Sequence, residues 1–257
     1  MRYAGTVLPI LRDSRERLME EWGLAEVLEY KDESAASAVT KLDIEIEHTV
    51  SKKLASSFPD IVFVGEEAGG DRKAERFWLM DPIDGTAHYI RGLPLCTSML
   101  ALVENGKVVF GAIYDFVNDR MYFAEKGEGA FCDDVRMSVS SRQLSNAYIG
   151  FETHYEHPGN LEFFNKLRTR STVVRTITAG WELAMVAAGK LDARICYDPY
   201  GCDYDYAPGT LLVAEAGGVV ANIASISYDY TNLDFIAANP VIFDELTRGK
   251  DALFPLV

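Results

Sequence analysis

The segment 77–94, FWLMDPIDGTAHYIRGLP, ends an apolar run in two aspartates, Asp81 and Asp84. Two close carboxylates repel each other and each is costly to desolvate, so the pair predicts a cation between them. Gly85 then permits close approach of the backbone, and Thr86 can begin a helix whose free N–H groups bind an anion. Carboxylate oxygens for Mg²⁺ beside an anion site are what a metal-assisted phosphatase needs.

Pro82, between the two aspartates, both shapes the backbone and excludes other acidic motifs. It fixes its own φ and favours an extended Asp81, so we predict that the strand ends there. It also occupies the position of the nucleophile in the aspartyl-phosphatase motif DxDGT, which excludes that chemistry in this register. A calcium EF-hand loop is excluded because Ile83 and Gly92 stand where oxygen ligands are required. The sequence has no GxxxxGK[ST], HExxH or GxSxG motif.

Further acidic residues follow apolar segments elsewhere and could complete a metal site: Asp43, Glu66, Glu67, Asp203 and Asp205. Each of them also has a purely structural interpretation. Asp205 is a candidate helix N-cap, Asp43 a first-turn helix acid, and Glu66-Glu67 a solvated turn. Taken singly, these residues leave both interpretations open.

Three segments together resemble the signatures of the inositol monophosphatase family: GEE at 65–67, WLMDPIDGT at 78–86 and DYAPGTLLVAEAGG at 205–218. The resemblance in order and spacing extends over about residues 31–220. It implies a Mg²⁺-dependent, lithium-sensitive phosphomonoesterase of the fructose-1,6-bisphosphatase-like group. It also implies a mixed α+β fold, a layered α-β-α-β-α sandwich.

The resemblance assigns roles to individual positions. Two or three Mg²⁺ ions per active site would be held by Glu66, Asp81, the Ile83 carbonyl, Asp84 and Asp205, with Asp43 near a third, weaker ion. Gly85 and Thr86 would bind phosphate. Glu66, Thr86 and Asp84 would be the catalytic residues, with Glu66 and Thr86 orienting a water that a cation activates. Thr40 and Glu67 would contact the metal ligands and hold them in position without binding the ions themselves.

The substrate contacts are less constrained. Asp198 lies where the family places an acid that contacts substrate hydroxyls, although it could simply precede the turn at Pro199. Arg175 is a candidate for binding a second phosphate or a carboxylate, and equally for an ion pair. Asp205 is the third candidate contact.

Several positions depart from the family pattern. Tyr204 replaces a tryptophan, Ser37 replaces an acid of the outer metal environment, and RTITAGWELA at 175–184 replaces a Gly-Ser/Thr-Ala-Ala stretch. These departures leave the substrate open among those of the family. We predict a small sugar or cyclitol phosphate of the inositol 1-phosphate type, with three family alternatives: fructose 1,6-bisphosphate, histidinol phosphate and 3′-phosphoadenosine 5′-phosphate. A non-catalytic regulator that binds a phosphorylated ligand is the alternative of another class, and the retained metal ligands argue against it.

The bulk properties limit the partners. The 257 residues carry a formal net charge of −14, which repels nucleic acids and anionic membranes, so neither is an expected partner. A small phosphorylated metabolite can still bind where cations invert the local field. No apolar run is long enough to span a membrane, and the four cysteines form no CxxC pair, which indicates a reducing cytoplasm. The resemblance implies a homodimer.

The elements that must position these residues can be predicted from periodicity. In an N-terminal α+β half (1–135) we expect helices over 6–22 and 43–57, a loop over 31–41, and strands over 61–64, 77–80, 97–103, 107–114 and 120–124. Asn105-Gly106 predicts a β-hairpin. A C-terminal α/β half (136–257) alternates strands near 146–151, 192–197, 218–222 and 234–238 with helices near 161–169, 179–189, 205–216 and 241–248.

Overall fold

The computed structural model describes residues 1–30 and 38–257. The helices of this part are α1 (Ala4–Arg12), α2 (Arg15–Glu21), α3 (Lys41–Ser57), α4 (Thr86–Tyr89), α5 (Pro158–Arg168), α6 (Ala179–Ala187), α7 (Asp203–Glu215) and α8 (Pro240–Thr247), with a short 3-10 turn, η2, at Leu144–Asn146. None of them is both long and apolar enough to cross a membrane.

A seven-stranded sheet forms the N-terminal half. Its spatial order follows the chain: β3 (Val62–Gly65), β4 (Arg76–Asp84), β5 (Thr97–Glu104), β6 (Lys107–Asp115), β7 (Arg120–Glu125), β8 (Gly129–Cys132) and β9 (Val135–Arg136). All neighbours are antiparallel except β3 and β4. The predicted hairpin between β5 and β6 is confirmed, and Asn105 and Gly106 both have positive φ, as its tight turn requires.

A five-stranded sheet forms the C-terminal half in the order β11-β10-β12-β14-β13. Its strands are β10 (Tyr148–Glu152), β11 (Thr172–Arg175), β12 (Ala193–Cys196), β13 (Val219–Asn222) and β14 (Phe235–Ala238). The two strands that flank β10 run parallel to it, whereas β14 is antiparallel to both of its neighbours.

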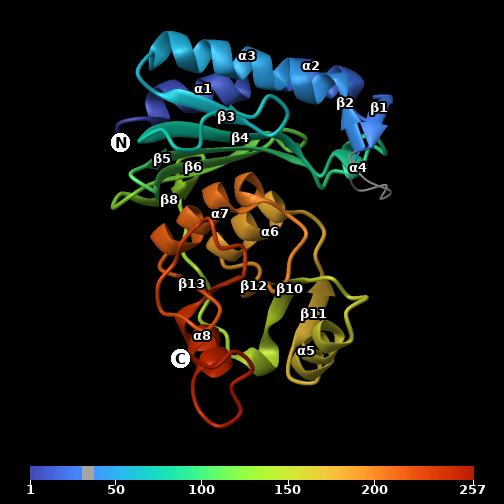
Figure 1. The fold of residues 1–257 in the computed structure, drawn as a ribbon, viewed down its shortest axis with the longest axis vertical. Coiled ribbons are helices and arrows are strands. Elements are labelled where there is room, and N and C mark those ends of the chain that lie inside the picture. The colour runs from blue at the N-terminus through green and yellow to red at the C-terminus, as the bar shows by residue number, and fades with distance from the viewer. Residues whose placement is uncertain (31–37) are drawn as a thin grey trace.

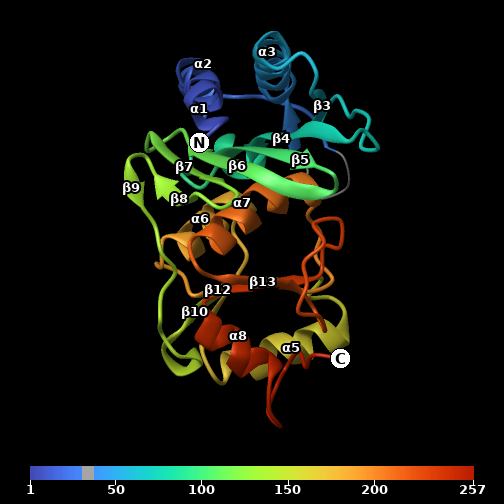
Figure 2. The ribbon, with the colours of Figure 1, turned by 90° about the vertical axis from the view of Figure 1, so that its left-hand side faces the viewer.

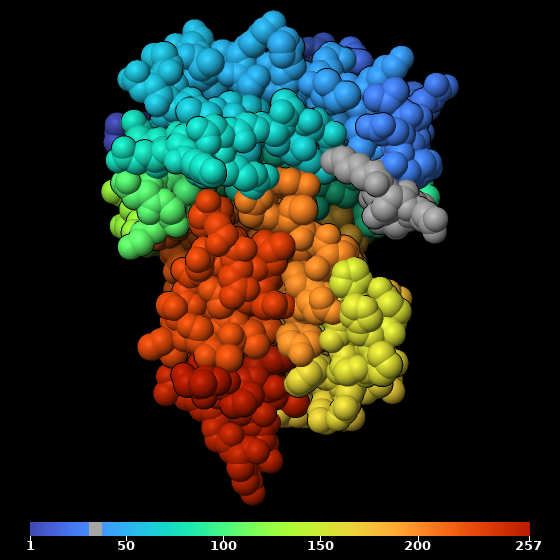
Figure 3. Space-filling view, viewed as in Figure 1, coloured from blue at the N-terminus to red at the C-terminus, as the bar shows by residue number. Residues whose placement is uncertain are grey.

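The two sheets and the helices stack in five layers (Figure 1). Helices α1 to α3 cover the outer face of the seven-stranded sheet, α6 and α7 lie between the sheets, and α5 and α8 cover the far face of the five-stranded sheet (Figure 2). The α-β-α-β-α sandwich that the resemblance implied is confirmed. In the space-filling view the N-terminal half is the wider body, and the C-terminal half tapers to a tip coloured red (Figure 3).

The middle helical layer joins the two halves. Leu183 of α6 and Leu212 of α7 are fully buried in one cluster with Met99 and Ile113 of the seven-stranded sheet and Phe235 of the five-stranded sheet. Helix α6 is buried along most of its length, which fits its almost uniformly apolar sequence. Because α6 and α7 start at the same end of this layer, their first turns can meet the end of β4.

Several predicted element boundaries need correction. The single helix expected over 6–22 is divided into α1 and α2 at Asp13 and Ser14, where the Ser14 hydroxyl donates to the Leu11 carbonyl at 2.6 Å. Of the loop expected over 31–41, residues 31–37 lie outside the described residues, and Ala38–Thr40 form β2, which pairs with β1 (Val27–Tyr30). The division at 135/136 falls within β9 and stays a prediction.

Candidate active site

Strand β4 carries both aspartates of the DPID segment and does not end at Asp81 as the sequence predicted. It continues to Asp84, with a bulge in its pairing to β5: Asp81 lies opposite Met99 and Asp84 opposite Thr97. Pro82 has no N–H to donate to the ladder, and a bulge tolerates that loss. Residues three apart normally face opposite sides of a sheet, so the extra residue is what brings both carboxylates to one face.

Asp81, Asp84 and Asp205 form one cluster. A carboxylate oxygen of each lies within 4.8 Å of the other two. Asp81 and Asp84 are only 2% and 6% exposed, whereas Asp205 is partly exposed in the first turn of α7. The N-cap interpretation of Asp205 is wrong, because Cys202 is the N-cap of α7; Asp205 is the third residue of the helix, and its carboxylate accepts the Cys202 N–H.

The first turn of α6 binds the Asp84 carboxylate. The N–H groups of Gly180 and Ala179 donate to it at 2.8 and 3.3 Å, and the Thr97 hydroxyl donates at 3.1 Å. A Cβ at position 180 would lie 3.0 Å from Asp84 Oδ2 and would overlap the Thr97 hydroxyl, so glycine allows this close approach. The N-terminal turn of a helix favours a negative charge, which explains how Asp84 is tolerated in the interior.

Burial and mutual repulsion raise the pKa values of the cluster. Desolvation is the main cause for Asp81, followed by the charges of Glu66, Asp205 and Asp84. Burial likewise raises the pKa of Asp205, and the neighbouring Asp84 charge adds to it. Burial raises the pKa of Asp84 to about 6 although the Gly180 N–H opposes this. Without a compensating positive charge, the site therefore holds protons more tightly than ordinary carboxyls do.

Glu66 reaches the site from the turn after β3. Its N–H donates to the Met80 carbonyl at 3.0 Å, which places it beside Asp81 at the end of the parallel β3–β4 pair. The loop that follows is tied to α7 through an ion pair between Arg72 and Asp203. The sequence-predicted residues Glu66, Asp81, Asp84 and Asp205 thus come together from three separate segments.

Glu47 is a residue of this site that the sequence reasoning missed. Its buried carboxylate on α3 accepts the N–H groups of Glu67 and Ala68, at 2.9 and 2.8 Å, and so fixes the turn that carries Glu66. A Cβ at Gly65 would overlap this carboxylate, so glycine is required there. Glu47 lies four residues after Asp43, on the same buried face of the helix, and this spacing of two acids was the available signal.

Gly85 and Thr86 form the turn that follows the aspartates. Gly85 has φ +81° and precedes the short helix α4. The Thr86 hydroxyl lies 2.8 Å from the Ile83 carbonyl and 3.2 Å from Asp43 Oδ1, so its single proton is shared between two acceptors. Thr40 donates its N–H and its hydroxyl to Asp43 Oδ2 at 2.8 and 2.7 Å. Burial nevertheless raises the pKa of Asp43 to about 6.

The donor set fits a hard divalent cation. All side-chain donors are carboxylate oxygens, which Mg²⁺ and Ca²⁺ prefer. Asp81 Oδ1 is buried and has no hydrogen-bond partner among the described residues, an arrangement that costs free energy unless a ligand occupies it. The carboxylate donors and the unpartnered Asp81 Oδ1 together identify this cluster as the place where a cation would be held.

Of the three predicted substrate contacts, Asp205 belongs to the acidic cluster, whereas Asp198 and Arg175 lie outside it. Asp198 has φ +48° and binds His157 Nδ1 at 2.7 Å and Asn160 Nδ2 at 2.6 Å. Arg175 is exposed, and its guanidinium lies 4.2 Å from the centre of the Tyr155 ring. Asp198 and Arg175 make these contacts rather than hydrogen bonds or ion pairs to the three clustered aspartates, so their roles at the substrate stay predictions.

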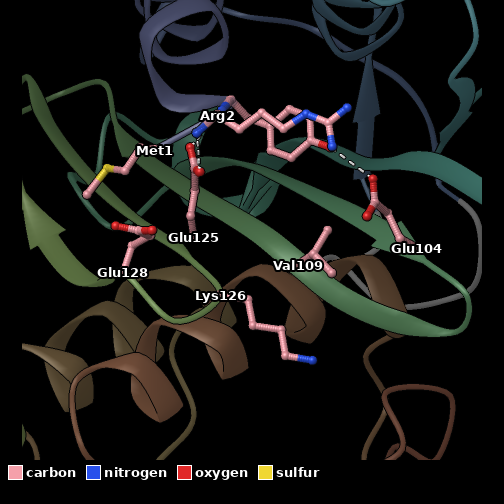
Figure 4. Close-up of a pocket in the computed structure, with 8 residues that line it drawn as sticks. Met1, Arg2, Glu104, Val109, Glu125, Lys126 and Glu128 are labelled. Carbon is pink, nitrogen blue, oxygen red and sulfur yellow. Dashed lines mark hydrogen bonds between the residues drawn. The ribbon is translucent and has the colours of Figure 1, made fainter.

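A separate pocket lies beside the N-terminus and takes no part in this site (Figure 4). On one of its walls the Glu125 carboxylate accepts the N–H groups of Arg2 and Tyr3, at 2.5 and 2.7 Å. These bonds hold the start of α1 on β7, and the lining includes none of the predicted site residues.

Comparisons with known proteins agree with this geometry. A family model described as the inositol monophosphatase family matches residues 8–251. A fructose-1,6-bisphosphatase/inositol-1-monophosphatase of Thermotoga maritima is 31% identical over 245 residues, covering 94% of this chain and 93% of the relative. An inositol monophosphatase of Dictyostelium discoideum is 32% identical over 234 residues, covering 86% and 84%. A solved IMPase structure from Thermotoga maritima has a TM-score of 0.85 at 29% identity and covers 95% of both chains.

Proposed function

The chain belongs to the inositol monophosphatase family, whose members are metal-dependent phosphoric monoester hydrolases, and we propose that it is a Mg²⁺-dependent phosphatase of the inositol 1-phosphate type. The observation that carries this proposal is the cluster of Asp81, Asp84 and Asp205 around the unpartnered Asp81 Oδ1. A purely structural role does not explain why three carboxylates lie within 4.8 Å of one another with Asp81 Oδ1 unpartnered, whereas a cation site accounts for both features.

In this proposal the cations are held by Glu66, Asp81, the Ile83 carbonyl, Asp84 and Asp205, with Asp43 beside a further, weaker site. Bound Mg²⁺ would lower the pKa of a coordinated water and stabilise the negative charge on the phosphoryl and leaving-group oxygens. The protein's own contribution is to hold these oxygens on one face of β4 and at the first turn of α7. Glu47 and Thr40 keep the supporting acids in place.

Thr86 and Gly85 would position the reacting groups. With its proton shared between Ile83 O and Asp43 Oδ1, the Thr86 hydroxyl keeps its lone pairs to accept a hydrogen bond from the attacking water. Glu66 would accept the second proton of that water and so orient it toward phosphorus. The backbone N–H groups at the start of α4, reached over the side-chain-free Gly85, would bind phosphate oxygens.

The preferred substrate is a small cyclitol or sugar monophosphate. The curated relatives named as inositol monophosphatases support the inositol 1-phosphate type. Fructose 1,6-bisphosphate is the second candidate, because the Thermotoga maritima relative carries that activity in its name. In that case the exposed Arg175 guanidinium would supply the positive charge for a second phosphate.

A phosphate-release panel tests the proposal. The purified protein is incubated with inositol 1-phosphate, fructose 1,6-bisphosphate, histidinol phosphate or 3′-phosphoadenosine 5′-phosphate, each with Mg²⁺ and with EDTA. We expect Mg²⁺-dependent release with the highest kcat/KM for inositol 1-phosphate. A higher value for another substrate would overturn the substrate assignment alone, and no release from any of the four would favour the ligand-binding regulator.

Three further expectations stay predictions of the family resemblance. They are a homodimer, inhibition by lithium and a cytoplasmic location. Light scattering coupled to size-exclusion chromatography checks the first. A lithium titration of the phosphate-release assay checks the second, and fractionation of the source cells checks the third.

A further inference from the structure

Behind the acidic cluster, one guanidinium is buried between two carboxylates. Arg194 of β12 forms ion pairs with Glu152 of β10 and Glu182 of α6, and the three side chains are 1%, 2% and 0% exposed. Burying three charges is costly, and apolar residues of similar volume are often at least as stabilising in such a place. Stability alone therefore does not account for this triad.

The Glu182 end of the triad controls the segment that leads into α6. Its carboxylate accepts the Ile177 N–H at 2.9 Å and the Thr176 hydroxyl at 2.9 Å. Within three residues of these contacts the chain reaches the Ala179 and Gly180 N–H groups that bind Asp84. By fixing residues 176 and 177, Glu182 thus also fixes the N–H groups that donate to Asp84.

The Glu152 end controls the segment that leads into α7. A single oxygen, Oε1, accepts the Tyr200 N–H at 3.2 Å, the Gly201 N–H at 3.0 Å and the Tyr206 hydroxyl at 2.6 Å. Gly201 lies directly against the metal-site acid, because a Cβ there would be 3.1 Å from Asp205 Oδ2. The position of Asp205 therefore depends on where Glu152 holds this segment.

Arg194 joins the two ends, with one terminal nitrogen on Glu182 and the other on Glu152. We propose that the Glu152–Arg194–Glu182 triad is a positioning unit that sets Asp84 and Asp205 at the separation a divalent cation requires. Its effect on turnover rests on the proposed function, but its effect on cation binding does not. A lysine has one ammonium in place of the planar fork, so it cannot present a separate nitrogen to each carboxylate as Arg194 does.

The test compares cation binding in two variants and a matched control. Mg²⁺ affinity is measured by isothermal titration calorimetry without substrate, and kcat and KM by phosphate release. For Arg194→Lys we expect a Mg²⁺ Kd raised by roughly 10- to 100-fold and a lower kcat, as for other residues that support metal ligands, with KM little changed. Tyr206→Phe, which removes only one donor to Glu152, should raise the Kd by a smaller factor.

Tyr114→Phe is the control for Tyr206→Phe. Tyr114 is also a fully buried tyrosine that donates to a carboxylate, Asp119, at 2.8 Å, but it lies on β6 and outside the triad. We expect it to leave the Mg²⁺ Kd unchanged. A lower melting temperature in Arg194→Lys with an unchanged Kd for the folded fraction would overturn the proposal.

Tyr206→Phe decides the question if Arg194→Lys does not fold. A Kd equal to that of Tyr114→Phe would then overturn the proposal, and a higher Kd would support it. Absence of phosphate release by the wild-type protein would instead count against the proposed function, since the calorimetric comparison does not depend on turnover.

Discussion

At Asp84 a negative charge is buried between the predicted cation site and the first turn of α6. Asp84→Asn keeps an oxygen for the α6 N–H groups but removes the charge that would bind a cation. We expect kcat to fall by roughly 100-fold or more, the order seen when a single transition-state contact is removed, while the fold persists. Phosphate release and circular dichroism measure the two effects.

Asp115→Asn is the control for Asp84→Asn, because Asp115 is also a buried aspartate at the end of a strand of the same sheet. It accepts hydrogen bonds from Asn118 and lies outside the acidic cluster. The turnover of the Asp115→Asn variant should stay close to that of the wild-type protein. Equal losses in the two variants would mean that buried charge in general, rather than the acidic site, supports activity.

The sequence predicted some site residues better than others. Asp81, Asp84 and Asp205 stand in recognisable motifs, and the structure brings them together. Glu47 and Arg194 were missed because their roles arise from contacts with segments far away in the chain. In the sequence, Glu47 is marked by its spacing of four residues from Asp43, and Arg194 is marked as a charge inside an otherwise apolar strand, ARIC at 193–196.

Among the elements, the turn between β4 and α4 depends most on one glycine. Gly85 has φ +81°, and a Cβ there would lie 2.6 Å from Thr178 Cγ2 and 2.7 Å from the Leu95 carbonyl. In Gly85→Ala we expect a stability loss of at least about 1–2 kcal/mol from the positive φ, together with a large loss of phosphatase activity because the turn must move. Chemical denaturation and phosphate release test both.

Gly127→Ala separates backbone strain from displacement of the site. Gly127 has φ +84°, yet a Cβ there would have nothing within 4 Å. We expect a comparable strain cost in this variant but normal kcat. Loss of activity in Gly127→Ala as well would show that reduced stability, not the position of the phosphate-binding turn, limits turnover.

Element prediction succeeded where burial is extensive. The central strands of the seven-stranded sheet are covered on both faces and read as continuous apolar runs, so β4 to β7 were predicted. The short strands β1, β2, β8, β9 and β11 were missed, because two to four residues are too few to show a periodic pattern. The bulge at Pro82 escaped prediction because proline indicates only that a ladder bond is lost, not how the strand adapts.

At the scale of the whole molecule, the acidic site should couple stability to pH and to Mg²⁺. Burial raises the pKa of Asp43 and Asp84 to about 6 from an ordinary 3.8. Between these values the folded protein binds more protons than the unfolded chain, so the metal-free protein loses stability as pH rises from about 4 to about 6. A bound cation replaces the protons and offsets this loss.

Melting curves with and without Mg²⁺ measure this coupling. We expect Mg²⁺ to raise the melting temperature clearly at pH 7.5, where the carboxylates are ionised, and hardly at all at pH 5, where protons compete. An increase that is as large at pH 5 as at pH 7.5 would mean that Mg²⁺ acts elsewhere on this strongly acidic surface, whose net charge is −14.

The central claim is that carboxylates from three segments form one divalent-cation site between the two halves of the molecule. Anomalous diffraction from crystals soaked in Mn²⁺ tests it most directly, because Mn²⁺ takes the same oxygen ligands as Mg²⁺ and scatters anomalously. The account predicts anomalous peaks in contact with Asp81, Asp84 and Asp205, with Glu66 beside them. Well-occupied Mn²⁺ peaks elsewhere, with none among these three aspartates, would contradict it.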